Sequence, residues 1–128
     1  MRLLLDTHAL LWWALDHPNL SAPAREAIGD PNNEVRVSAA TAWELAIKIG
    51  IGRLRLPIDL DVLLAEELRA NGFVSLPVTT AHAVRVLALP QHHRDPFDRM
   101  LIAQALAEGL TLVSADEVVH AYAVPVLW

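Results

Sequence analysis

Four acidic residues stand where a folded chain could bring them together: Asp6, Glu44, Asp98 and Asp116. Carboxylate oxygens are the ligands that Mg²⁺ prefers, and a Mg²⁺ ion held by a few carboxylates keeps waters and bridges to substrate phosphates. Two such ions can activate an attacking water and stabilise a leaving oxygen. The chemistry that this set of residues offers is therefore metal-assisted hydrolysis of a phosphodiester.

Two of these acids directly follow short apolar runs that predict buried strands. Asp6 follows Arg2–Leu5, and Asp116 comes just after Leu110–Ser114. In a parallel sheet covered by helices, ligands bind beyond the carboxyl ends of the strands, so both acids would lie at one edge. Each could instead cap the helix that follows it. Two acids at strand ends together favour a site.

Glu44 lies within Ala39–Ile49, a predicted helix that is apolar almost all round and should be largely buried. Burying a carboxylate is costly unless it is paired or bound to a metal. The structural alternative is an ion pair with Lys48 one turn later, worth about 0.3–0.5 kcal/mol at a surface. Because so little else on this helix is polar, we favour a functional role for Glu44.

Asp95 and Asp98 stand at a predicted helix start. Asp95 precedes Pro96, which is the usual order of an N-cap and the first helical residue. Asp98 falls in the first turn, where a carboxylate also suits the helix dipole. We interpret Asp95 as a cap rather than a ligand, and Asp98 as the better candidate for a ligand that projects into the site, although the helix start alone explains both acids and support for a ligand must come from outside this segment.

Weaker signals surround these acids. His92 and His93 could be metal ligands or a proton shuttle, but we interpret them as an exposed loop pair. His8 could touch substrate or be an ordinary residue of a first helical turn. Arg94 and Arg99 flank Asp98 and could hold phosphate, and the alternative for both is a solvated surface charge.

Composition limits the classes of protein to which the chain could belong. With 128 residues, of which 54% are hydrophobic, we expect a single domain spanning 1–128 with a real core. No apolar run reaches the roughly 18 residues of a membrane span, so we expect a soluble, cytoplasmic protein. The absence of cysteine excludes disulfides, Cys-ligated zinc and thiol nucleophiles.

The net charge of −5 argues against a nucleic-acid partner when taken alone, because such proteins are usually basic. Nine of the ten basic residues are arginines, however, and arginine pairs with phosphate in a planar, bidentate manner. A carboxylate cluster also loses negative charge when it binds cations. The acidic balance therefore weakens the nuclease hypothesis without excluding it.

Strand and helix patterns alternate along the chain, which predicts an α/β fold with a mostly parallel sheet between two helical layers. The predicted strands are Arg2–Leu5, Glu34–Ser38, Phe73–Leu76, Leu110–Ser114 and Val124–Leu127. The predicted helices are His8–Leu15, Ala22–Ile28, Ala39–Ile49, Leu60–Ala70, Thr80–Leu89, Pro96–Glu108 and Asp116–Tyr122.

Taken in order, the segments that carry the acids resemble the motifs of PIN-domain proteins of the VapC toxin type. The matching segments are Leu4–Trp12, Ser38–Lys48, His93–Ala105 and Leu112–Asp116. The resemblance covers essentially the whole chain. It implies a three-layer α/β/α fold, endoribonuclease activity that depends on Mg²⁺ or Mn²⁺, a partner antitoxin and a homodimer.

Carried over residue by residue, the resemblance assigns the metal site to the same four acids. They are Asp6, Glu44, Asp98 and Asp116. It adds Asp95 as a possible accessory, and Ser114 as a supporting hydroxyl where the family often has Thr or Ser.

Three other classes of protein were considered. A phosphatase of the haloacid-dehalogenase type would need a second Asp two residues after the first, where His8 stands. A response-regulator receiver would need a Lys late in the chain, but the only Lys is Lys48. A PIN-like module that only binds a partner and regulates is the third, and the intact acids argue against it.

Overall fold

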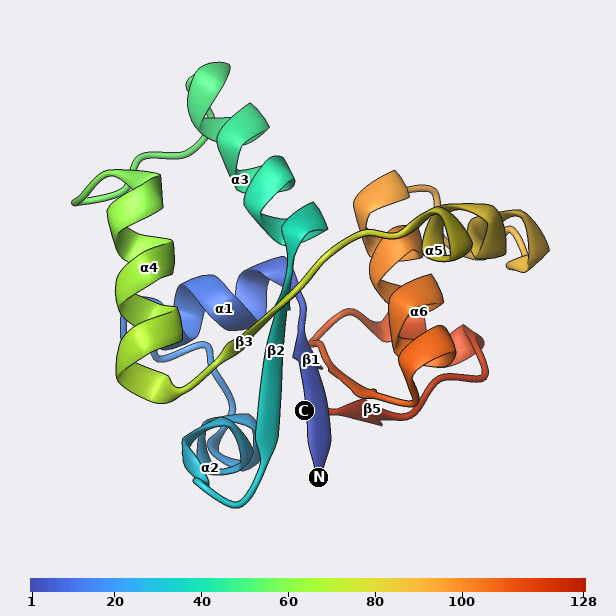
Figure 1. Cartoon of the computed structure of the whole chain (residues 1–128), viewed down its shortest axis with the longest axis horizontal. Coiled ribbons are helices and arrows are strands. Elements are labelled where there is room, and N and C mark those ends of the chain that lie inside the picture. The colour runs from blue at the N-terminus through green and yellow to red at the C-terminus, as the bar shows by residue number, and fades with distance from the viewer.

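Five parallel strands form the centre of the protein in the computed structural model, which describes residues 1–128. Their order across the sheet is β3-β2-β1-β4-β5 (Figure 1). The strands are β1 (Arg2–Leu5), β2 (Glu34–Ser38), β3 (Val74–Leu76), β4 (Thr111–Val113) and β5 (Val126–Leu127). This confirms the predicted parallel α/β fold and places β1, which carries Asp6 at its end, in the middle of the sheet.

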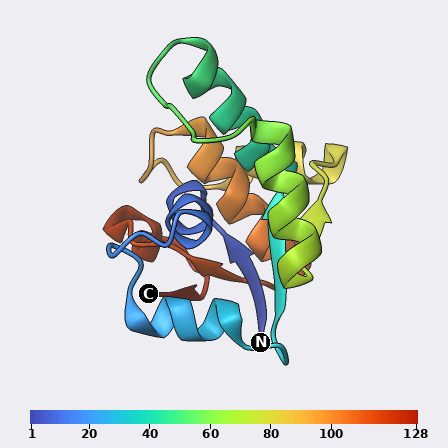
Figure 2. The same cartoon turned by 90° about the vertical axis from the view of Figure 1, so that its left-hand side faces the viewer.

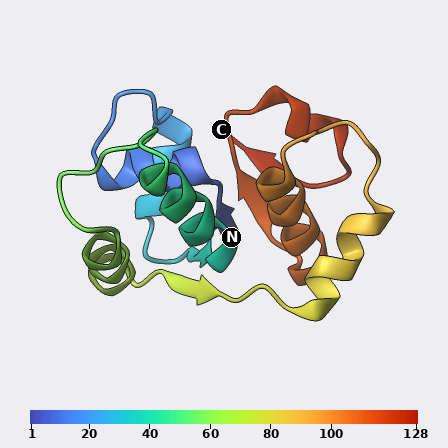
Figure 3. The same ribbon diagram turned by 90° about the horizontal axis from the view of Figure 1, so that it is seen from above.

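Helices cover both faces of the sheet. They are α1 (Thr7–Ala14), α2 (Ala22–Gly29), α3 (Ala39–Gly50), α4 (Leu60–Asn71), α5 (Thr80–Arg85) and α6 (Pro96–Glu108), with 3₁₀ turns η1 (Val86–Ala88) and η2 (Glu117–Ala121). Viewed from the side, α1, α2 and α4 lie in front of the strands (Figure 2). From above, α1–α4 and the pair α5 and α6 form separate groups (Figure 3). None of these helices is long and apolar enough to cross a membrane.

The alternation of side chains along β1 explains why it supports two cores. Leu3 and Leu5 point into the core built with α1 and α2, whereas Leu4 points into the core built with α6. All three leucines are fully buried. A strand that is apolar at successive positions therefore belongs in the middle of a three-layer fold.

Side-chain caps mark the starts of several helices, including the one predicted at Asp95. The side chains of Ser38, Thr79 and Asp95 accept hydrogen bonds from main-chain amides at the starts of α3, α5 and α6. Gly109, with φ of 66°, ends α6 in the left-handed conformation. Asp59 stands at the N-cap position of α4, but its side chain makes no capping hydrogen bond.

Two predicted helices are shorter and partly of another type. The helix expected over 80–89 ends at Arg85 and continues as the 3₁₀ turn η1, and the helix expected over 116–122 is the 3₁₀ turn η2. The reason at η1 is tertiary, because the Arg99 guanidinium donates to the main-chain carbonyls of Val86 and Leu89.

Candidate active site

The carboxyl ends of the two central strands bring the first pair of acids to one edge of the sheet. Leu5 of β1 lies opposite Val113 of β4, and the Asp6 amide donates to the Val113 carbonyl at 3.1 Å. A hollow of about 260 Å³ opens at this edge. Its lining residues are Asp6, His8, Asp98, Ala115 and Asp116.

Asp6 is both a helix cap and a member of this site. Its side chain is only 6% exposed, and its Oδ1 accepts from the amide of Ala9 at 2.8 Å at the start of α1. Burial raises the pKa of Asp6, and the neighbouring charge of Asp116 raises it further, against opposing effects from Ser114, Ala9 and His8. The two interpretations of Asp6 were therefore not exclusive.

Glu44 is buried on α3 and is held by two partners. The Thr7 hydroxyl donates to its Oε1 at 2.7 Å, and the Lys48 ammonium lies 2.6 Å from its Oε2. The ion pair with Lys48 considered from the sequence is thus present. Sequence reasoning missed Thr7, although it directly follows Asp6.

Asp98 projects from the first turn of α6 into the hollow. Burial raises its pKa to about 7, helped by the negative charges of Asp95, Asp6 and Glu44 and opposed by His93. Asp95 is the predicted cap, since its Oδ1 accepts from the amides of Phe97 and Asp98 at 2.8 and 3.3 Å.

Of the three acids that line the hollow, Asp116 is the one whose pKa is lowered. Burial alone would raise its pKa, but hydrogen bonds from His93 and from the Val118 amide more than offset this and lower it. The Val118 amide donates to Oδ1 at 2.9 Å. Ser114 Oγ accepts from the Asp116 amide at 3.1 Å, so Ser114 shapes the turn that presents this carboxylate.

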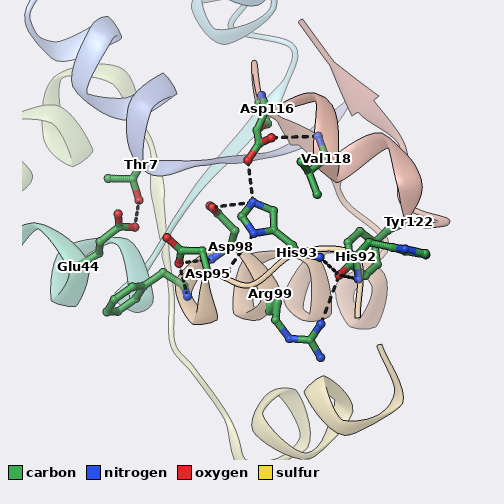
Figure 4. A network of polar contacts seen from close by, with 12 residues as sticks. Thr7, Glu44, His92, His93, Asp95, Asp98, Arg99, Asp116, Val118 and Tyr122 are labelled. Carbon is green, nitrogen blue, oxygen red and sulfur yellow. Dashed lines mark hydrogen bonds and ion pairs between the residues drawn. The ribbon is translucent and has the colours of Figure 1, made fainter. Parts of the chain in front are cut away.

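His93 corrects the interpretation of an exposed histidine pair. Its side chain is 13% exposed, and its Nε2 lies 2.7 Å from Asp116 Oδ2 and 3.2 Å from Asp98 Oδ2 (Figure 4). His92 is exposed as expected. Two adjacent histidines in a polar loop carry no periodicity that says which of them turns inward, so the sequence held no signal for this.

Arg99 is likewise not where it was expected. Only 8% of the residue is exposed, and its guanidinium donates to the carbonyls of Pro90, Val86 and Leu89 and to the Tyr122 hydroxyl. It is neither a solvated charge nor directed at the acids, because its donors are taken up by the chain before α6. Arg94 is exposed, and His8 lines the hollow.

The donor set fits a hard divalent cation. The hollow offers carboxylate oxygens from different elements and no Lys or Arg that would neutralise them there. The raised pKa values of Asp6 and Asp98 reflect burial and mutual repulsion, both of which a bound cation would relieve. Glu44 is paired to Lys48 and accepts from Thr7, and it does not line the hollow. It is close enough that its negative charge helps to raise the pKa of Asp98.

Residues 3–125 match the family described as PIN domain. This chain belongs to the PIN-domain family. A similar PIN protein is Ribonuclease VapC22 of Mycobacterium tuberculosis, 36% identical over 117 residues that cover 88% of this chain and 85% of that one. Ribonuclease VapC16 of the same organism is 36% identical over 70 residues, covering 52% of this chain and 50% of its own.

Solved PIN-fold structures share the architecture at low sequence identity. VapBC2 from Rickettsia felis, solved bound to a DNA fragment from its promoter, has a TM-score of 0.75 at 17% identity and covers 100% of this chain and 99% of that chain. FitAcB from Neisseria gonorrhoeae has a TM-score of 0.66 at 22% identity, covering 98% and 96%. These likenesses confirm the three-layer fold.

Proposed function

We propose that this PIN-domain chain is an endoribonuclease that hydrolyses RNA phosphodiester bonds with Mg²⁺ or Mn²⁺, and that it is the toxin of a toxin–antitoxin pair. The convergence of Asp6, Asp98 and Asp116 on one hollow, with Glu44 beside it, carries the proposal. The ribonuclease names of two relatives support it.

The residues of the site would divide the work as follows. Asp6, Asp98 and Asp116, which line the hollow, would hold the cation with Glu44 beside them, and the cation when bound supplies a water of lowered pKa and a positive charge beside the phosphate. Main-chain amides fix one oxygen each of Asp6 and Asp116, so these carboxylates keep their direction. His8 lines the hollow from an exposed position, where it would contact the RNA.

An antitoxin and a second copy of the chain are the protein partners that we propose. One solved neighbour is described as a toxin–antitoxin complex from Klebsiella pneumoniae. Trp43, Ile47 and Ile51 repeat every fourth residue along α3 and its end, and are 64%, 39% and 62% exposed. A protein partner would cover such a stripe. The protein would encounter both the RNA and the antitoxin in the cytoplasm, which is the location that we propose for it.

Cleavage of a structured RNA by the purified protein tests the proposed activity. We expect cleavage with Mg²⁺ or Mn²⁺, none with EDTA, and none from Asp6→Asn or Asp98→Asn. Asp61→Asn, an exposed acid in the first turn of α4, is the matched control and should cleave normally. Cleavage that persists in EDTA or in Asp98→Asn would contradict the proposal. Metal binding without cleavage of any RNA would favour the alternative, a regulatory binding module.

A further inference from the structure

The loop before α6 places His93 beside the acids, and hydrogen bonds with Tyr122 and Arg99 hold this loop in position. The Tyr122 hydroxyl accepts from the amides of His92 and His93, at 3.2 and 2.8 Å, and donates to the Pro90 carbonyl at 2.8 Å. The buried Arg99 guanidinium donates to that same carbonyl at 2.9 Å. Figure 4 shows this support on the side of His93 that faces away from the carboxylates.

Hydrogen bonds on both ring nitrogens define how the imidazole acts. The Asp95 amide donates to Nδ1 at 3.1 Å, so Nδ1 is an acceptor and carries no hydrogen. Nε2 then carries the hydrogen and donates it to Asp116 Oδ2 at 2.7 Å, while Asp98 Oδ2 lies 3.2 Å from the same nitrogen. The ring is thus fixed as a donor to Asp116, with the carboxylate of Asp98, from a different element, in contact with the same N–H.

We propose that His93 is a positioning residue, which holds the carboxylate of Asp116 after β4 by a hydrogen bond beside that of Asp98 on α6 and so sets the spacing of two metal ligands. The proposal rests on the proposed function, because it assumes that these acids bind the cation. Hydrogen bonds to ligating groups commonly change metal affinity 10–100-fold when removed.

This role differs from that of a ligand. Ligand atoms of His93, Asp98 and Asp116 lie within 4.8 Å of one another, which by distance alone would suit a three-residue metal site. With Nδ1 accepting from a main-chain amide, however, the Nε2 lone pair is occupied by its hydrogen. The imidazole therefore serves the carboxylates and not the cation.

Two substitutions separate the donor role from the rest of the side chain. In His93→Asn, the amide oxygen can replace Nδ1 as acceptor for Asp95, but nothing reaches the carboxylates. In His93→Gln, an amide N–H can reach the position of Nε2. We expect Mn²⁺ binding, measured by calorimetry without RNA, to weaken about 10–100-fold in His93→Asn and by less than about threefold in His93→Gln. Thermal unfolding in EDTA checks that both variants fold.

A second measurement uses the unaltered protein. Long-range ¹H–¹⁵N spectra should show the His93 ring with its hydrogen on Nε2, and the hydrogen should stay there when Mg²⁺ is added. Loss of that hydrogen on adding Mg²⁺, or equal weakening in both variants, would overturn the proposal in favour of ligation by the ring. Wild-type affinity in a folded His93→Asn would also overturn it. A wild-type protein that binds no Mn²⁺ would overturn the proposed function and this role with it.

Discussion

Replacing Asp98 by Asn should abolish cleavage and yet stabilise the metal-free protein. The folded protein raises the pKa of Asp98 from 3.8 to about 7, so between these pH values the folded state binds a proton that the unfolded state has released. The free energy of unfolding therefore falls as the pH rises through this window. Above pH 7 the folded state carries the full cost of burying the charged carboxylate. Asn keeps the shape of the side chain, and an oxygen near His93, without the charge.

The size of the effect follows from the same shift. A rise in pKa from 3.8 to about 7 corresponds to about 4 kcal/mol if it is fully expressed. The Asp98 side chain is 25% exposed, and water screens its charge, so we expect a gain of about 1–2 kcal/mol at pH 8. The lost interaction with the dipole of α6, about 0.5 kcal/mol, works in the other direction and is smaller.

Urea denaturation in EDTA at pH 8 and at pH 5 measures this gain. At pH 5 the folded wild type already carries the proton, so the gain should fall to less than about half. Mg²⁺ should stabilise the wild type at pH 8 but not Asp98→Asn. The control Asp61→Asn loses an exposed first-turn acid and should lose a few tenths of a kcal/mol. The reasoning would be refuted if Asp98→Asn were no more stable than wild type at pH 8, or if its gain in unfolding free energy were the same at pH 5 and pH 8.

Two further predictions concern Arg99 and Thr7, whose side chains support the site through hydrogen bonds. Arg99→Met should cost about 2–4 kcal/mol of unfolding free energy in urea, because the carbonyls of Val86, Leu89 and Pro90 lose a charged donor and that of Leu89 is buried. The exposed Arg94→Met should change it by less than about 0.5 kcal/mol, and equal effects would contradict the assignment. Thr7→Val should cost about 1–2 kcal/mol, since Glu44 loses its hydroxyl donor, and Thr7→Ser should recover most of it in the same assay; an unaffected Thr7→Val would show that the 2.7 Å contact contributes little.

Much of the site was predictable because its causes are local. Asp95 caps α6 through amides two and three residues away, and Asp6 caps α1 through Ala9, so a short window of sequence contains both partners. The two acids at strand ends needed one global rule as well, that parallel strands end at the same edge of a sheet. Side-chain alternation along β1 likewise explains why Leu4 lies in one core and Leu3 and Leu5 lie in the other.

The roles of Arg99 and His93 depended on contacts that no local pattern encodes. Arg99 is buried against the carbonyls of Val86, at the start of η1, and Leu89, just after it, which it reaches from α6 across 13 and 10 residues of sequence. His93 meets Asp116 across 23 residues of sequence, and Tyr122 selects the loop conformation from 29 residues away. The sequence by itself determined which acids follow strands, which residue caps α6 and the type of fold, since these depend on residue type and short spacing. Only the tertiary structure decided which polar side chains face the acids, because long-range packing chooses among loop conformations that the sequence leaves equally open.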